Sequence, residues 1–243
     1  MVALQASENE ITLVDGVGIA AVNGPQSVVI SGDEEAVLAI KAEFEARGRK
    51  TSRLKVSHAF HSPLMEPMLA EFRGVVAGLT FAEPSLPVVT TSAGGGRWTE
   101  PEYWVKHVRE AVRFADAVTS LAAQGVGRFL EIGPEGVLTG MAQASVENAT
   151  LIPALRKGRD ETSAIIAAIG ALYVSGLSAD WEAFFGGHGA RRIDLPTYAF
   201  QNERFWLRGD GATGGDPASM GLGAADHPLL GATVALADST ASC

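Results

Sequence analysis

The chain has 243 residues, of which 47% are hydrophobic and 19% are charged, a balance typical of folded globular proteins and not of disordered ones. Its formal net charge of -9 at pH 7 argues against a nucleic-acid-binding or anionic-membrane surface, because such a surface needs clustered Lys and Arg.

Cysteine use and the N-terminal residues indicate a compartment. The only cysteine is Cys243, so neither an intrachain disulfide nor a cysteine-based metal site is expected. The first ten residues have neither the basic nor the apolar region of a signal peptide, and no run approaches 18 apolar residues. We therefore expect a soluble, cytoplasmic protein.

The first 56 residues are predicted to form a small α+β unit. A strand is followed by a weak helix or loop, two strands joined through Asn23-Gly24-Pro25, a helix and a last strand. The ranges are 2–4, 8–13, 17–22, 27–30, a helix opening at the Ser31-x-x-Glu34 capping box and stopping near Gly48, and 51–56. This βαββαβ order is that of a ferredoxin-like fold.

Residues 57–176 alternate between helical and strand patterns. We expect helices at 63–77, 102–108, 114–124, 135–144 and 160–176, and strands at 87–90, 128–132 and 150–155. Strands that alternate with helices predict βα units on a mostly parallel sheet. Residues 181–207 read as irregular and aromatic, 209–225 as a flexible linker rich in Gly and Ala, and 227–237 as the start of a new apolar segment.

A histidine-containing segment, Val56-Ser-His-Ala-Phe-His-Ser-Pro-Leu-Met65, carries the strongest functional signal. Ser62 is a natural N-cap and Pro63 suits the first helical position, so His61 stands at the start of a helix. The helix dipole disfavours an imidazolium there, and a neutral imidazole can act as a general base. On the residues alone, His61 is more simply explained as a polar residue in front of a helix.

Five segments in order resemble acyltransferase domains of modular type I polyketide synthases. The His58-Ala59-Phe60-His61 tetrad resembles their signature. Further matches are Ile19–Pro25 with Val28–Gly32 (the ferredoxin-like insert), Phe129–Leu138 (a strand-turn-helix), Leu195–Trp206 (the linker after the domain) and His227–Gly231 (the opening of a dehydratase hot-dog domain).

This resemblance implies an α/β fold class, with a ferredoxin-like βαββαβ subdomain and the C-terminal part of an α/β-hydrolase-like acyltransferase core. The implied domains are the subdomain at 1–56, the core part at 57–158, a post-acyltransferase linker at 159–208, a flexible linker at 209–225 and a truncated dehydratase start at 226–243.

The implied reaction transfers a malonyl unit from malonyl-CoA to the phosphopantetheine thiol of an acyl carrier protein, through an acyl-serine. His61 takes the role of the base. No covalently bound cofactor and no metal are expected. The implied partners are the acyl carrier protein and the ketosynthase and dehydratase domains of the same synthase.

The resemblance also implies an extender-unit preference. His58, Ala59 and Phe60 occupy the positions where methylmalonyl-selecting members tend to carry Tyr-Ala-Ser. Phe60 would fill the space of an α-methyl group, and one methyl group is worth about 1–3 kcal/mol of discrimination. The alternative is that Phe60 is an ordinary core residue.

The chain departs from the family pattern in three ways. It has no Gly-x-Ser-x-Gly, the nearest approach being Gly176-Leu-Ser-Ala-Asp180 on the wrong side of the histidine. We therefore expect the isolated chain to be inactive, with apolar sheet faces left uncovered. The family more often has Asn at His107 and Pro at Ala111, in a loop that helps to orient the imidazole.

Several motifs of the chain have an alternative functional or structural interpretation. His58 and His61 lack the carboxylate or cysteine cluster of a metal site, and Gly94-Gly95-Gly96 lacks the lysine of a phosphate loop. Two alternatives stay open for the turn at Gly133–Gly136: it faces an anion, or it only packs a helix on the sheet. Tyr198, Phe200, Phe205 and Trp206 suit a packed linker better than a base-stacking platform. A free-standing malonyl transacylase and a non-catalytic carrier-protein docking module are the rival functions.

Overall fold

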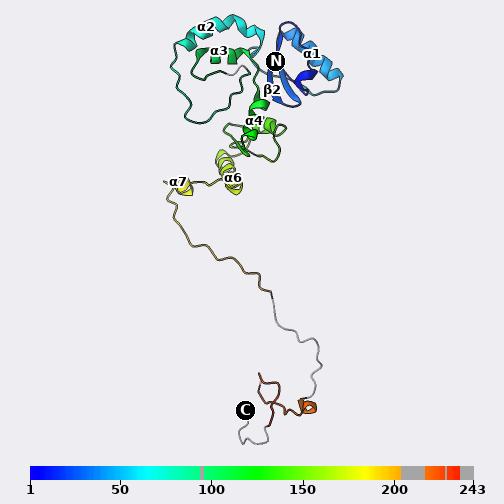
Figure 1. Ribbon diagram of the computed structural model, residues 1–243, viewed down its shortest axis with the longest axis vertical. Helices are drawn as coiled ribbons and strands as arrows, with labels where there is room; N and C mark the ends of the chain where they lie inside the picture. The colour runs from blue at the N-terminus through cyan, green and yellow to red at the C-terminus, as the bar shows by residue number, and fades with distance from the viewer. Residues whose placement is uncertain (94–95, 204–216, 228, 236–243) are drawn as a thin grey trace. The chain divides into compact units, whose positions relative to one another are not determined.

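The computed structural model describes residues 1–93, 96–203, 217–227 and 229–235 (Figure 1). The chain divides into two units, Met1–Phe184 and Phe185–Cys243, and each is described by itself. The first unit contains the predicted histidine segment and all of the strands named below.

A four-stranded antiparallel sheet forms the N-terminal part of the first unit. Its strands are β1 (Val2–Leu4), β2 (Val17–Gly24), β3 (Ser27–Gly32) and β4 (Thr51–Arg53). The spatial order is β2-β3-β1-β4, with Val2 opposite Ile30 on one side and Arg53 on the other. This is the strand order of a ferredoxin-like sheet, as the sequence predicts. The first of the two expected helices is only a 3-10 turn, η1 (Glu8–Glu10).

Helix α1 (Glu34–Ala46) covers one face of this sheet (Figure 1). Its buried side chains Val37, Ile40 and Phe44 recur at helical spacing and pack against Val2 and other inward-facing strand residues. Asp33 caps the helix by accepting a hydrogen bond from the Ala36 N–H at 3.0 Å. The sheet and α1 thus share one closed core.

The predicted capping box at Ser31 and Glu34 is wrong. Strand β3 continues through Ser31 to Gly32, so Ser31 is fully buried in the sheet and the cap moves two residues on, to Asp33. Gly32 has φ 152°, and a Cβ there would lie 2.0 Å from the Gly16 carbonyl oxygen. Pairing of β3 with β2 therefore overrides the local helix signal.

Two helices follow the histidine segment. The 3-10 turn η2 (Pro63–Met65) leads into α2 (Glu66–Ala77), and α2 packs against α3 (Pro101–Arg109). The predicted strand at 87–90 is absent: the stretch is irregular, and pairing in this region is limited to an isolated bridge between Ser92 and Val112. Pro84 and Pro87 lack the N–H groups that a strand ladder needs, which accounts for the missing strand.

Helix α4 (Phe114–Ala123) packs on strand β2 of the four-stranded sheet. Its residue Ala115 joins Val22 and Val28 in a second buried cluster. This contact connects the later part of the unit to the four-stranded sheet.

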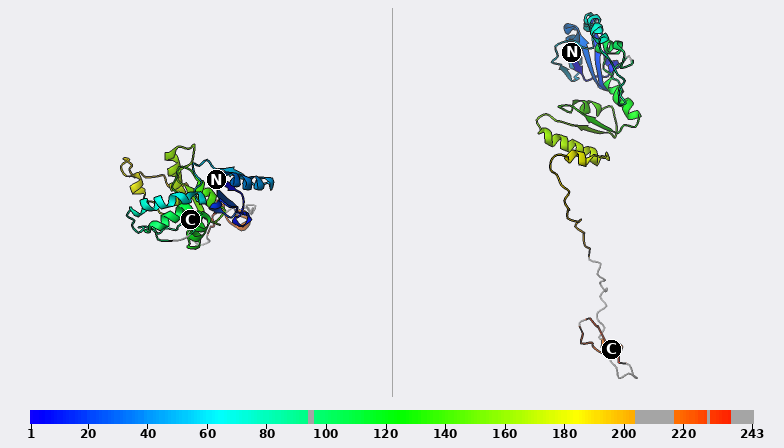
Figure 2. Two further views of the ribbon diagram at one scale, coloured as in Figure 1. Left: turned by 90° about the horizontal axis from the view of Figure 1, so that it is seen from above. Right: turned by 90° about the vertical axis from the view of Figure 1, so that its left-hand side faces the viewer.

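A parallel strand pair forms the last part of the first unit. It consists of β5 (Arg128–Glu131) and β6 (Thr150–Pro153), joined through α5 (Val137–Ala142). Helices α5 and α6 (Glu161–Val174) lie on either side of this pair, and α7 (Trp181–Phe185) follows (Figure 2). Asp160 caps α6 by accepting the Ser163 N–H at 2.8 Å. The expected parallel βα arrangement is present, with two strands instead of three.

The second unit contains the 3-10 turn η3 (Pro217–Met220) and a bridge between Gly223 and Thr233. Several predictions fall on residues outside the described ranges: Gly94 and Gly95 of the glycine turn, Phe205 and Trp206 of the aromatic run, residues 209–216 of the linker 209–225, Pro228 and Cys243. In the part of the chain that the structure describes, no helix is long and apolar enough to cross a membrane.

Candidate active site

His61 lies in a turn that the neighbouring serine holds in place. The Ser62 side chain is fully buried; its hydroxyl donates to the Ala59 carbonyl at 2.6 Å and accepts the Leu64 N–H at 3.2 Å. The predicted N-cap is therefore confirmed, on the short turn η2. His61 itself has φ 55°, in the left-handed region that non-glycine residues seldom occupy. Such a backbone conformation costs about 1–3 kcal/mol and is concentrated at functional sites.

The imidazole of His61 is oriented by a backbone carbonyl 49 residues along the chain. Its Nδ1 lies 2.7 Å from the carbonyl oxygen of Glu110, and its backbone N–H donates to the Val108 carbonyl at 3.2 Å. A carbonyl oxygen only accepts, so Nδ1 carries the proton and Nε2 has a free lone pair. No side chain of the described residues hydrogen-bonds to Nε2. His61 is thus held in the tautomer that can receive a proton at Nε2.

The segment that supplies the Glu110 carbonyl is fixed to the sheet. The Val112 N–H donates a hydrogen bond to the Ala20 carbonyl, and the Val112 carbonyl accepts one from the Val22 N–H, both at 2.9 Å. The Arg113 guanidinium contacts both carboxylate oxygens of Glu8 at 2.8 Å and Asp116 at 2.7 Å. These bonds attach the 110–113 segment to β2 and η1, so the carbonyl that orients His61 is part of a rigid frame.

A second histidine lies beside the first. The ring of His107 meets that of His61 edge to face, with centroids 6.3 Å apart, and stacks on buried Tyr103 at 5.7 Å. Burial lowers the pKa of His107 below its ordinary value, and the neighbouring His61 lowers it further, although the Glu110 carboxylate opposes the shift. His107 therefore stays neutral at pH 7 and adds no charge beside His61.

The three predicted specificity residues stand immediately before His61. The His58 ring lies 5.8 Å from the Phe60 ring, and its Nδ1 is 2.9 Å from the Ser57 hydroxyl. Phe60 is 39% exposed, so it is not an ordinary core residue of the described part of the chain. Ala59 contributes its carbonyl to the Ser62 hydrogen bond. The ring of Phe60 is therefore available to contact a ligand or another polypeptide segment.

Among the described residues, no group of three or more His, Cys, Asp or Glu side chains is arranged to hold a metal ion. The ring of His61 contacts the ring of His107, a neighbour that the sequence analysis does not predict. The Nδ1 atom of His61 faces a carbonyl oxygen.

The Glu110 carbonyl is the functional group that sequence reasoning did not single out. The loop 106–114 was expected to orient the imidazole, but the particular backbone oxygen leaves no sequence signal, because every residue has one. His107 was noted only as a departure from the family pattern, and its place against His61 follows from the packing of α3.

Residues 1–179 match the family model described as acyl transferase domain. The chain is 50% identical to polyketide synthase GfsA of Streptomyces halstedii and 49% identical to phenolphthiocerol synthesis polyketide synthase type I Pks15/1 of Mycobacterium marinum. Each match covers 98% of this chain, but 3% and 12% of those proteins, respectively.

Solved structures of acyltransferase domains are also similar to this chain. The acyltransferase domain from the second module of the salinomycin polyketide synthase superposes with a TM-score of 0.74 at 48% identity, over 81% of this chain and 48% of that one. The acyl transferase domain of SpnD, in complex with 2-(pent-4-yn-1-yl)malonyl, gives 0.68 at 32% identity, over 72% and 46%. The chain spans about half of these solved domains and belongs to the acyl transferase domain family.

Proposed function

We propose that this chain is part of a polyketide synthase acyltransferase that transfers a malonyl unit from malonyl-CoA to the phosphopantetheine thiol of an acyl carrier protein. The observation that carries the proposal is the hydrogen bond from His61 Nδ1 to the Glu110 carbonyl, which leaves Nε2 free to take a proton. The family match to residues 1–179 supports the reaction class.

In the proposed reaction, His61 works twice. Nε2 takes the proton of a serine hydroxyl as its oxygen attacks the malonyl thioester carbonyl; the C–S bond breaks, and the imidazolium returns the proton to the departing CoA sulfur. Nε2 then takes the proton of the phosphopantetheine thiol. The sulfur attacks the malonyl ester, and the serine oxygen leaves and regains the proton. The Glu110 carbonyl stabilises the imidazolium of both steps through Nδ1–H.

The serine of this scheme is proposed to come from outside the 243 residues. The sequence contains no Gly-x-Ser-x-Gly, and the two buried hydroxyls near the site are engaged elsewhere: Ser62 bonds the Ala59 carbonyl, and Ser92 donates to the Glu110 carboxylate at 3.5 Å. The chain matches about half of the solved acyltransferase domains, which leaves room for the nucleophile segment in the other half. We propose that the chain alone is inactive for this reason.

The preference for malonyl is proposed to rest on Phe60. Its half-exposed ring beside His58 is free to contact the α-carbon of an extender unit, where a methyl group would meet it. A single methyl group changes binding by about 1–3 kcal/mol, so the expected preference is real but not absolute.

The domain assignment also remains a proposal. We place the subdomain at 1–56, the core part at 57–158, a post-acyltransferase linker at 159–208, a flexible linker at 209–225 and the start of a dehydratase domain from 226. Exposed Ile193, Leu195, Tyr198 and Phe200 support the linker, because such side chains normally pack on a neighbouring surface. Ketosynthase and dehydratase domains are the proposed neighbours, and the cytoplasm the proposed compartment.

Two rivals make different predictions. A free-standing malonyl transacylase of fatty-acid synthesis needs neither the 195–206 segment nor the 227–231 segment, and matches to synthases over 98% of the chain favour the longer protein. A non-catalytic docking module would bind a carrier protein without any upstream segment and without dependence on His61.

The test uses a polypeptide extended upstream to include the Gly-x-Ser-x-Gly segment. It is given equal malonyl-CoA and methylmalonyl-CoA, and its intact mass is measured. We expect a malonyl adduct that His61→Ala abolishes and that His188→Ala, at an exposed histidine of the second unit, leaves unchanged. A methylmalonyl adduct would contradict the role of Phe60, and a folded protein without any adduct would favour the docking module.

A further inference from the structure

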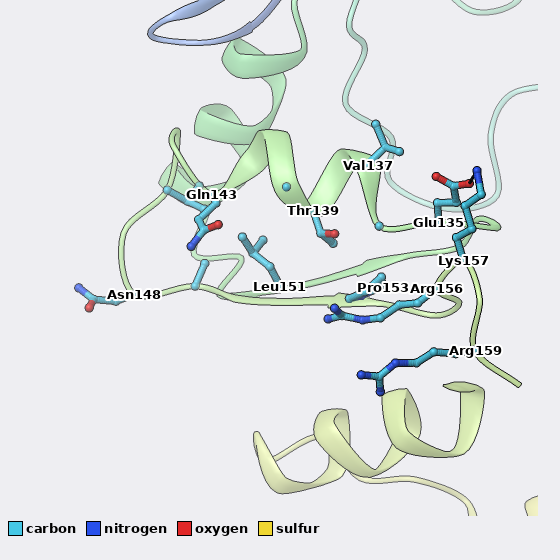
Figure 3. Close-up of a pocket in the computed structure, with 14 residues that line it drawn as sticks. Glu135, Val137, Thr139, Gln143, Asn148, Leu151, Pro153, Arg156, Lys157 and Arg159 are labelled. Carbon is cyan, nitrogen blue, oxygen red and sulfur yellow. Dashed lines mark ion pairs between the residues drawn. The ribbon is translucent and has the colours of Figure 1, made fainter. Parts of the chain in front are cut away.

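The structure contains a hollow of about 1000 Å³ that is lined by none of the residues described around His61. It runs along the edge of β6 and is bounded by α5 and by the turn that follows β6 (Figure 3). Thr139, Gln143 and Asn148 bring polar groups to it, and Leu151 and Pro153 bring apolar surface. This mixture is typical of sites that hold an organic ligand by a few polar contacts.

The charge of this hollow is unbalanced. Three cations, Arg156, Lys157 and Arg159, face a single carboxylate, that of Glu135, which lies 3.7 Å from the Lys157 ammonium group. Neither Arg156 nor Arg159 forms a side-chain hydrogen bond or an ion pair with any residue in the described ranges. Two uncompensated guanidinium groups thus line a cavity in a chain whose net charge is -9.

Other arginines of the first unit show that the lack of partners is not general. Arg47, Arg49, Arg53, Arg73, Arg97, Arg109 and Arg113 are each paired with a carboxylate. An acidic protein offers many such partners. The two arginines at the hollow are therefore available for an anion from outside the chain.

The turn after β6 places the two guanidinium groups together. Arg159 donates its backbone N–H to the Arg156 carbonyl at 3.2 Å, and Gly158, with φ 75°, reverses the chain between them. Both side chains extend in the same direction over the space between β6 and α6 (Figure 3). A small hollow of about 350 Å³ opens beneath them, because the α6 face that lines it consists of Ala164, Ala167, Ala168 and Ala171.

The position in the sheet also indicates a ligand site. Arg156 and Arg159 follow the carboxyl end of β6, and Glu135 follows that of β5, its parallel neighbour. Ligands of open α/β sheets bind at the carboxyl ends of the strands. Guanidinium groups match the geometry of phosphate oxygens and bind them through paired hydrogen bonds.

We propose that Arg156 and Arg159 bind the phosphate group of a pantetheine ester, whose amide chain lies along the polar and apolar lining of the larger hollow. The choice of a pantetheine ester rests on the proposed acyltransferase function, whereas the phosphate preference rests on the two arginines alone. The same phosphate occurs in CoA and in the phosphopantetheine arm of a carrier protein, so the experiment must separate these sources.

The test measures binding of three probes to the 243-residue chain by titration calorimetry: CoA, 4'-phosphopantetheine and pantetheine, which lacks the phosphate. We expect the two phosphorylated probes to bind and pantetheine to bind at least tenfold more weakly. Arg156→Gln and Arg159→Gln should each weaken CoA binding about tenfold, and the affinity should fall with added salt.

Two variants serve as matched controls. Arg47→Gln removes the same charge from an ion-paired site on α1 and should leave CoA binding unchanged. Lys157→Gln removes a cation of the same hollow that Glu135 already balances, so its effect should be smaller than that of either arginine. Circular dichroism of each variant checks that the fold is kept, and the titration is repeated in the upstream-extended polypeptide.

Each result decides the proposal. Arginine-dependent binding of both phosphorylated probes supports the proposal. Binding of CoA alone would mean that its adenosine phosphate part is recognised and would contradict a site for the pantetheine phosphate. Binding that ignores Arg156 and Arg159, equal binding of pantetheine, or no binding in either polypeptide would overturn it. Because no acyl transfer is needed, loss of the malonyl adduct with intact CoA binding would contradict only the proposed function.

Discussion

The two sheets of the first unit differ in how completely they bury their own apolar side chains. The four-stranded sheet and α1 enclose Val2, Ile30 and Phe44, each at most 2% exposed. Around the β5–β6 pair, Ile132 is 88% exposed, and Val174 of α6 is 85% exposed. Two parallel strands alone rarely form a stable sheet, since parallel sheets are normally covered on both faces. The part that holds His61 is therefore supported by a closed core nearby, whereas the β5–β6 part leaves large apolar side chains exposed.

The two sheets should differ strongly in local stability. Backbone amides of the β1–β3 pair should exchange with solvent at least a hundredfold more slowly than those of β5–β6, because they open only when the closed core opens. Hydrogen exchange followed by mass spectrometry measures both regions in one sample. Equal protection of the two pairs would show that the two sheets do not differ in local stability.

Shortening a side chain should destabilise the protein far more in the closed core than at the exposed surface of the β5–β6 pair. Phe44→Ala is expected to lower the free energy of unfolding of the four-stranded region by about 3–5 kcal/mol, because a buried aromatic ring leaves a cavity. Ile132→Ser, at an 88% exposed site, should change the free energy of unfolding by less than about 0.5 kcal/mol. The same variant should reduce self-association. Urea unfolding and light scattering measure the two effects, and similar destabilisation by both variants would contradict the assignment of the cores.

The turn at His61 should show an intermediate effect. Ser62→Ala removes a buried hydroxyl that makes two hydrogen bonds and caps η2, at an expected cost of about 1–2 kcal/mol. Ser175→Ala, which removes the single bond to the Leu172 carbonyl, is the matched control and should cost less. A larger loss for Ser175→Ala in the same urea titrations would show that the turn is held by other contacts.

His107 should make a small contribution to the pH dependence of the protein's stability. The pKa of His107 is lower in the folded protein than its ordinary value of 6.5, mainly through burial, so the unfolded chain binds its proton first as the pH falls. The stability linked to this group is complete above pH 6.5 and is lost as the pH falls through the lowered pKa. His107→Gln should therefore reduce the loss of stability between pH 7.5 and 5.5. Urea midpoints of both proteins at the two pH values measure it, and parallel losses would exclude the linkage.

Local sequence determined the elements whose signals lie within a few residues. The apolar spacing of α1, the start of α6 after residue 160 and the Ser62–Pro63 start of the turn after His61 appear where their patterns predict them. The strand order of the first sheet also follows, because alternation and the Asn23-Gly24-Pro25 turn specify β2 and β3 as neighbours. These patterns work because hydrogen bonds and side-chain contacts between near neighbours decide the local conformation.

The surroundings of the imidazole depend on contacts between residues far apart in the chain. A backbone carbonyl carries no sequence signature, so the bond from His61 to Glu110 and the approach of His107 required the packing of α3 and the attachment of Val112 to β2. The shift of the helix cap from Ser31 to Asp33 has the same origin, because β3 pairs with β2 through Gly32. In each case, pairing between residues far apart in the chain outweighs a local preference of about 1 kcal/mol.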